Sequence, residues 1–168
     1  MRIAVLSDTH DQILNLRAAV AYCNAYGAIM LIHCGDLISP FMLPELAEFK
    51  GAIHFVYGNN AGDQHLISRQ CGTKYPAITH HGNLGAVEAG GRKIAFTHYP
   101  EMARGIASQK LFDAVCCGHN HKYNVETIEG TVLINPGHLL GKDSQPGFCI
   151  LETSTMDVER VEVGEMFV

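Results

Sequence analysis

Short hydrophobic runs alternate with longer amphipathic segments in the first half of the chain. Three runs have the length and apolar character of buried strands, at Arg2–Leu6, Ile29–His33 and Ile53–Tyr57. Between the first two runs, apolar residues of Asp11–Tyr26 recur every three or four positions, which predicts a helix that stops at Gly27. Shorter helical segments are predicted at Pro40–Phe49 and 63–70. This alternation predicts parallel strands joined by right-handed crossovers.

The second half consists mostly of short β-like runs. Gly90-Gly91 and residues 128–131 are typical of tight hairpin turns, and one helix is predicted at Glu101–Gln109. The predicted strands are Ala77–His80, Gly85–Ala89, Ile94–Thr97, Ala114–Cys117, Tyr123–Ile128, Val132–Ile134, Phe148–Glu152 and Val158–Val163. No linker-like segment divides the chain. We therefore expect one α/β domain over residues 1–168, with two stacked sheets and helices outside.

Composition narrows the classes of partner. The chain has 12 Lys and Arg against 17 Asp and Glu, a net charge of −5, and no basic cluster. Duplex nucleic acid requires such a cluster to neutralise its phosphates, so we expect no duplex binding. The most apolar stretch, Ala28–Ile32, is far too short to span a membrane, and no signal peptide precedes it. We therefore expect a cytoplasmic protein without membrane association, whose six cysteines are reduced.

Residue types that commonly bind metal ions follow immediately after five of the predicted strands. They stand in Asp8-Thr9-His10, Gly35-Asp36, Gly58-Asn59-Asn60, Thr97-His98 and Gly118-His119-Asn120-His121. Sites in α/β sheets form beyond the carboxyl ends of the strands, so these residues can converge on one point. The chain also has ten histidines, an excess that points to metal or proton chemistry.

The kinds of ligand indicate which metals and substrates fit. Imidazole, carboxylate and amide oxygen together suit Mn, Fe, Zn or Ni better than Ca or Mg alone. Seven ligands are too many for one tetrahedral zinc, and suit two ions that share a bridging carboxylate. Two divalent ions, two aspartates and a bridging hydroxide leave one net positive charge, which attracts an anionic phosphate ester. Metal ions lower the pKa of water, so a hydroxide would be available to attack phosphorus near neutral pH.

Taken in order, the five motifs resemble those of the calcineurin-like metallophosphoesterases, specifically the small YfcE-type branch. Ile134-Asn135-Pro136-Gly137 matches a further family element, and the resemblance extends from residue 1 to about 153. It implies a four-layer αββα sandwich of two mixed β-sheets flanked by helices, without a cap domain. It implies one metal bound by Asp8, His10, Asp36 and His121. The other would be bound by Asp36, Asn59, His98 and His119, with Asp36 bridging and manganese the expected metal.

The third motif departs from the family pattern. Many members have a histidine after the metal-binding asparagine, where it contacts the phosphate or protonates the leaving group, whereas this chain has Asn60. An amide can donate a hydrogen bond to phosphate but cannot act as a general acid near neutral pH. We expect Asn60 to take part in catalysis with Asp36 and His10, and esters with acidic leaving groups, such as aryl phosphates, to react best. His138 stands where the family commonly has serine; a surface or structural role is favoured over that of substitute proton donor.

Other interpretations of single residues stay open. Asp8 alone could cap the following helix, and Gly58-Asn59-Asn60 could be an ordinary turn. His33 and His54 lie within or beside predicted strands and are interpreted as structural. The pair His80-His81 could border the site.

The function predicted is a dinuclear-metal phosphoesterase that hydrolyses small phosphodiesters with a metal-bridging hydroxide. The alternative is a weakly catalytic or non-catalytic protein-binding scaffold of the retromer-subunit type, a branch in which the metal ligands are typically degraded. All seven ligand positions are filled here, which favours catalysis. Relatives of this type suggest a small homo-oligomer, a dimer or tetramer.

Overall fold

Two mixed β-sheets pack face to face in the computed structural model, which describes residues 1–142 and 144–164. The first sheet has the strand order β11-β10-β1-β2-β3-β4. Strands β1 to β4 are parallel, and β10 and β11 are antiparallel to their neighbours. The bounds are β1 Arg2–Leu6, β2 Met30–His33, β3 Ala52–Phe55, β4 Ile78–His80, β10 Gly147–Glu152 and β11 Asp157–Glu162. The predicted parallel crossovers are confirmed.

The second sheet has the order β5-β6-β7-β9-β8 and is also mixed, with parallel pairing on both sides of β7. Antiparallel β5 and β8 close its two edges. The bounds are β5 Leu84–Ala89, β6 Arg92–Thr97, β7 Ala114–Cys116, β8 Tyr123–Ile128 and β9 Thr131–Pro136.

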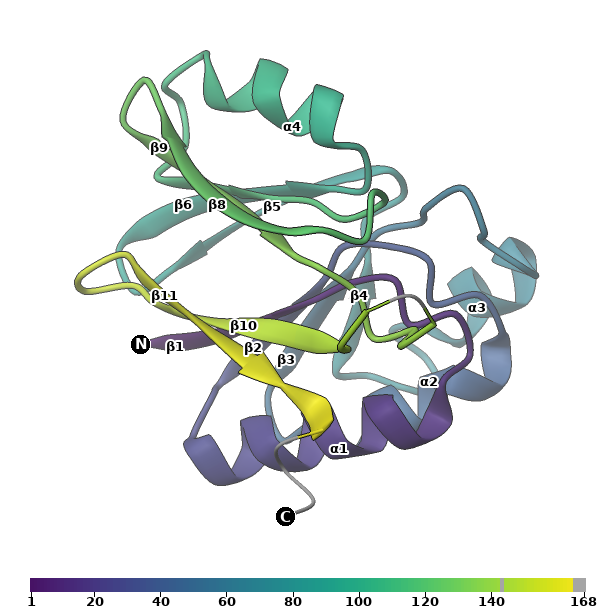
Figure 1. The fold of residues 1–168 in the computed structure, drawn as a ribbon. Helices are drawn as coiled ribbons and strands as arrows, with labels where there is room; N and C mark the ends of the chain where they lie inside the picture. The colour runs from purple at the N-terminus through teal and green to yellow at the C-terminus, as the bar shows by residue number, and fades with distance from the viewer. Residues whose placement is uncertain (143, 165–168) are drawn as a thin grey trace.

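Helices cover the outer face of each sheet, which gives four layers (Figure 1). α1 (Ile13–Tyr26), α2 (Leu43–Leu46) and α3 (Gln64–Gln70) pack on the first sheet, and α4 (Pro100–Ala107) packs on the second. In β1, Ala4 and Leu6 face the helices while Ile3 and Val5 face the second sheet. Burial on both faces explains why this strand is an uninterrupted apolar run.

The predicted elements are all present, with differences at their ends. The first helix begins at Ile13 instead of Asp11, and β3 ends at Phe55 instead of Tyr57. The segment predicted as one helix at Pro40–Phe49 is a 3₁₀ turn, Pro40–Met42, followed by α2. Pro44 has no N–H to donate, so it is accommodated only in the first turn of a new helix.

All six cysteines are free thiols, and five of them are buried. Among the described residues, no helix combines the length and the apolar character that a bilayer crossing requires.

Candidate metal centre

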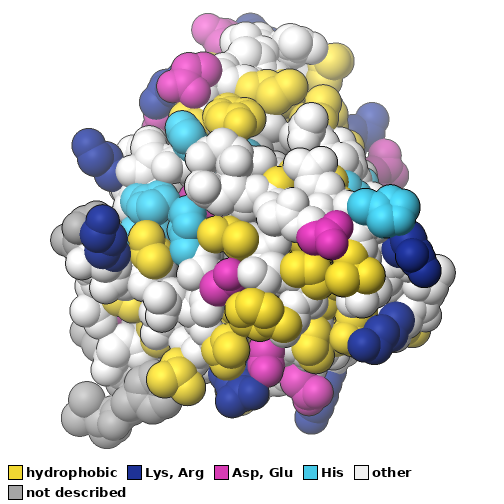
Figure 2. Space-filling view, turned by 90° about the vertical axis from the view of Figure 1, so that its right-hand side faces the viewer, with side chains coloured by type: hydrophobic (Ala, Val, Ile, Leu, Met, Phe, Trp, Pro, Cys, Tyr) yellow, Lys and Arg dark blue, Asp and Glu magenta, His cyan; other side chains and the backbone are white. Residues whose placement is uncertain are grey.

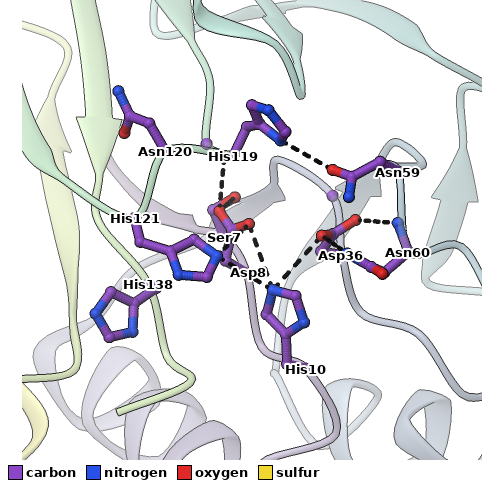
Figure 3. A network of polar contacts seen from close by, with 12 residues as sticks. Ser7, Asp8, His10, Asp36, Asn59, Asn60, His119, Asn120, His121 and His138 are labelled. Carbon is purple, nitrogen blue, oxygen red and sulfur yellow. Dashed lines mark hydrogen bonds and ion pairs between the residues drawn. The ribbon is translucent and has the colours of Figure 1, made fainter. Parts of the chain in front are cut away.

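The predicted ligands converge where both sheets present the carboxyl ends of their parallel strands (Figure 3). The first sheet supplies four of them after β1, β2 and β3, and the second sheet supplies three after β6 and β7. They are Asp8, His10, Asp36, Asn59, His98, His119 and His121. Histidine side chains gather on this face of the molecule (Figure 2). The structure therefore brings these seven residues together in one cluster.

The Asp8 carboxylate is buried, and only one of its two oxygens accepts hydrogen bonds. Its Oδ2 accepts hydrogen bonds from Ser7 Oγ at 2.6 Å and from the backbone N–H of His119 at 2.9 Å. Its Oδ1 is buried and accepts no hydrogen bond, although His121 Nε2 lies 3.3 Å and His10 Nε2 3.7 Å away. Such an atom is costly unless a cation satisfies it, so the donor set fits a metal ion at this point.

Competing effects act on the pKa of the Asp8 carboxyl. Burial raises this pKa, while contacts with His10, His121 and Ser7 lower it by more in total, so it lies well below the usual range. Asp8 is therefore an anion near neutral pH, the form that a metal ion requires.

Asp36 lies between the two halves of the cluster. Its Oδ2 is 3.5 Å from His10 Nε2, and its Oδ1 is 3.6 Å from His98 Nε2. The carboxylate is 2% exposed, so it is shielded from water on most sides. Each oxygen faces a different imidazole, which is the arrangement expected of a bridging carboxylate.

Asn60 holds this carboxylate from the remaining side. Its backbone N–H donates to Asp36 Oδ1 at 2.8 Å, and its side-chain amide donates to Asp36 Oδ2 at 2.7 Å (Figure 3). The Asn60 amide thus contacts a ligand carboxylate in this structure.

His98 presents the correct tautomer for metal binding. Its Nδ1 lies 2.8 Å from the Cys34 carbonyl oxygen, which can only accept, so Nδ1 carries the proton. In this tautomer, the His98 Nε2 faces Asn59 Oδ1 at 2.9 Å. His119 Nδ1 is also 2.9 Å from that oxygen. Nitrogen and oxygen ligands this close together suit a shared cation.

On the other side of Asp36, His10 and His121 face each other with their Nε2 atoms 3.2 Å apart. Two groups of residues offer ligand atoms that all lie within 4.8 Å of one another inside each group. The first group is Asp8, His10 and His121, and the second is Asp8, Asp36 and His98. Each group could hold a cation, and the two groups share Asp8.

The backbone at the centre is strained. Asp8, His10, Asp36, His119 and His121 all have positive φ, between 46° and 72°. Non-glycine residues rarely adopt this conformation, and such strain concentrates at functional sites.

Two glycines leave room for the carboxylates. A Cβ at Gly118 would lie 1.9 Å from Ser7 Oγ and 2.5 Å from Asp8 Oδ2. A Cβ at Gly58 would lie 2.0 Å from Asp36 Oδ1. Glycine is therefore required at both places by the close approach of a ligand or its partner.

The single-residue alternatives can now be compared with the structure. Asp8 does not cap α1, whose cap position is Gln12. His33 is fully buried, and its Nε2 lies 2.7 Å from Thr9 Oγ1, which fixes the loop between two ligands. Burial lowers the pKa of His33 to about 4, so it is neutral and structural.

His54 and His81 contact each other, with Nδ1 and Nε2 2.9 Å apart, and both rings pack on Phe96. His80 stacks on Tyr57 instead. These are packing contacts in and beside the strands, and they explain the pair His80-His81 without a role at the metal centre.

His138 is not at the surface, since it is 2% exposed. Its Nδ1 accepts from the Gly141 N–H at 3.0 Å, so its Nε2 carries the proton and donates to Ser144 Oγ at 2.8 Å. The ring also packs against His121, with 5.0 Å between centroids. These contacts support the structural role over that of proton donor.

Residues that support the ligands were harder to find from the sequence. Ser7 and Thr9 stand between or beside ligands and contact Asp8 and His33. Asn135 donates its amide to the carbonyl of Gly118 at 2.8 Å, which steadies the turn that carries two histidines. The only sequence signal for Asn135 is the family element around it.

Three comparisons place the chain among known proteins. The calcineurin-like phosphoesterase superfamily domain matches residues 1–156. Phosphodiesterase MJ0936 of Methanocaldococcus jannaschii is 29% identical over 167 residues, which cover 96% of this chain and 98% of that protein. A probable metallophosphoesterase of Methanothermobacter thermautotrophicus is 28% identical over 175 residues, covering 98% and 94% of the two chains.

Solved structures of known proteins share this fold. The structure of an archaeal phosphodiesterase has a TM-score of 0.90 at 28% identity and covers 96% of this chain and 99% of its own. The phosphoesterase YfcE of E. coli has a TM-score of 0.68 at 16% identity, with coverage of 97% and 100%. Zinc-bound Vps29 of Entamoeba histolytica has 0.68 at 18%, with coverage of 97% and 99%. The last two likenesses concern the fold alone.

Proposed function

Because the chain belongs to the calcineurin-like phosphoesterase superfamily and is a phosphoric ester hydrolase, we propose that it hydrolyses small phosphodiesters with two divalent metal ions. Asp8, His10, Asp36 and His121 would bind one ion. Asp36, Asn59, His98 and His119 would bind the other. Manganese is the metal we expect, and Fe, Zn and Ni suit the same ligands.

One observation carries the proposal: the buried Asp8 Oδ1 accepts no hydrogen bond and is faced by two imidazole Nε2 atoms. A protein that bound no cation here would leave this oxygen at a cost of about 1–3 kcal/mol. The position of Asp36 between His10 and His98 supports a second ion beside the first.

The chemistry that such ions supply is activation of water as a nucleophile and stabilisation of charge on phosphoryl oxygens. The chain's own residues prepare the site for it. Ser7 and the His119 N–H orient Asp8, Asn60 orients Asp36, and the Cys34 carbonyl orients His98. These partners fix the ligands before substrate arrives, so little reorganisation is needed during the reaction.

Neither Asn60 nor His138 is placed to protonate the leaving group. Asn60 is an amide, and both ring nitrogens of His138 are already hydrogen-bonded. We therefore propose that diesters with acidic leaving groups are hydrolysed best, since these leave without protonation.

A protein-binding scaffold is the second candidate, because Vps29 proteins share the fold. The ligand set is the feature that would discriminate, because all seven proposed positions carry metal-binding residue types. We therefore favour catalysis over the scaffold.

The test is metal content together with hydrolysis of bis(p-nitrophenyl) phosphate. We expect the purified protein to retain manganese after dialysis and to hydrolyse the diester. Asp36→Asn should lower the rate at least about 100-fold and reduce the bound metal, because the bridging ligand is lost.

Asp157→Asn, at the exposed start of β11, is the matched control and should change neither quantity. Metal retention without hydrolysis would favour the scaffold. A protein that retains no manganese, zinc or iron would contradict the metal centre itself.

A further inference from the structure

An exposed aromatic ring stands at the edge of the metal centre. Tyr99 directly follows the ligand His98, and its side chain is 39% exposed. Its ring lies edge-on to His98, with 5.2 Å between centroids, and to His119, with 5.1 Å. The two imidazoles are themselves 5.0 Å apart. Tyr99 is thus the third ring of a cluster whose other two members are proposed ligands.

The main chain at Tyr99 is restricted, and the ring itself contacts two imidazoles. Tyr99 has φ −89° and ψ 126° and precedes Pro100, which occupies the first turn of α4. A residue before proline is confined to extended conformations, so the ring cannot swing away with its main chain. An exposed aromatic ring with restricted motion loses little conformational entropy when it binds a second planar group.

Met102 extends the apolar edge. It lies three residues after Tyr99, on the same side of the helix, and is 44% exposed. Its Sδ accepts a hydrogen bond from Thr97 Oγ1 at 3.2 Å, which holds the side chain near the end of β6. Hydrophobic side chains border the histidines on this face of the molecule (Figure 2). An otherwise polar site therefore has one apolar side.

We propose that Tyr99 is a specificity-determining residue, whose exposed face stacks on a planar aromatic group carried by the phosphate ester. The inference rests on the phosphodiesterase function proposed above and adds a substrate class to it. Aryl esters and nucleotides both bring such a group close to the phosphorus. Offset or edge-to-face contact between rings favours an aromatic group over an aliphatic one of equal size.

Binding of two matched phosphonates tests this without turnover. Benzylphosphonate and cyclohexylmethylphosphonate differ only in whether the ring is planar and aromatic, and their P–C bond resists hydrolysis. In calorimetric titration of the manganese-loaded protein, we expect roughly three- to tenfold tighter binding of the benzyl compound. Tyr99→Phe should keep the preference, and Tyr99→Leu should abolish it.

A second arm separates nucleotides from simple aryl esters. Thymidine 5′-(p-nitrophenyl phosphate), bis(p-nitrophenyl) phosphate and ethyl p-nitrophenyl phosphate share one leaving group and differ in the other ester group. A kcat/KM advantage of the thymidine ester that is lost in Tyr99→Leu would identify nucleotides as the source. An advantage of the bis-aryl ester alone would identify aryl esters.

The outcomes distinguish this inference from the one it rests on. Equal affinity of the wild-type protein for both phosphonates would overturn the role of Tyr99 and leave the metal centre intact. If Tyr99→Leu weakened both phosphonates equally and lowered manganese affinity, Tyr99 would only position His98 and His119. Absence of any phosphonate binding in the presence of manganese would contradict the metal-centre proposal and this one with it.

Discussion

At the scale of single residues, the role of Asn60 is the point at which structure adds most to sequence. The sequence showed that an amide replaces the expected imidazole and suggested contact with phosphate. In the structure, both the backbone N–H and the amide of Asn60 donate to Asp36. We therefore infer that Asn60 positions a proposed metal ligand, a contact that the sequence could not show because it depends on how two loops meet.

Asn60→Ala should weaken manganese binding by roughly 10- to 100-fold, because it removes one hydrogen bond from the bridging carboxylate. It should leave the dependence of rate on leaving-group pKa unchanged, since an amide supplies no proton. The measurements are a manganese titration and rates for a series of substituted aryl diesters. Asn124→Ala, an exposed amide on β8, is the control. Unchanged metal affinity, or a steeper leaving-group dependence, would contradict the positioning role.

At the scale of elements, hydrophobic periodicity predicted the strands and helices because most of them bury a regular face. β1 is buried on both sides, and α1 buries Leu16, Ala19, Val20 and Cys23. The clustering of the proposed ligands was predictable because these residues follow the strands immediately. Element ends and supporting contacts were not, since they depend on local capping and on neighbours distant in sequence, such as Asn135 beside Gly118.

Alanine substitutions at two glycines with different surroundings test how closely other atoms approach the backbone at Gly118. Gly118→Ala should destabilise the protein by at least about 2 kcal/mol and lower its metal affinity, because the new Cβ would displace Ser7 and Asp8. Gly105 lies within α4 with open space around it, so Gly105→Ala should stabilise the protein by about 0.5–1 kcal/mol. Denaturant unfolding of both variants measures these changes. Equal tolerance of both substitutions would refute the tight approach at Gly118.

At the scale of the whole molecule, one fully buried and three partly buried histidines couple stability to pH. Burial lowers the pKa of His33 and of His80 to about 4, and lowers the pKa values of His54 and His81. The unfolded chain binds these protons below about pH 6.5, while the folded protein does not until about pH 4. Stability contributed by these groups is therefore present above pH 6.5 and is lost as the pH falls toward 4.

In the metal-free protein, the free energy of unfolding should decrease between pH 6.5 and 4, with His33 contributing at most about 3 kcal/mol. His33→Gln should flatten this dependence, because glutamine can still donate to Thr9 but does not titrate. Urea unfolding in EDTA at several pH values gives the slope, with exposed His65→Gln as the control. A slope of the same size in His33→Gln would rule out His33 as its source.

The origin of the ligands in both sheets has a mechanical consequence. The ion proposed to bind Asp8, His10 and His121 would link the first sheet to the second, across the apolar layer that includes Ile3, Ile94 and Phe96. Metal binding and the packing of that layer are then linked equilibria, and free metal at 100 times its Kd would add about 2.7 kcal/mol to the folded state. By reciprocity, a substitution that opens a cavity between the sheets, far from any ligand, would weaken metal binding.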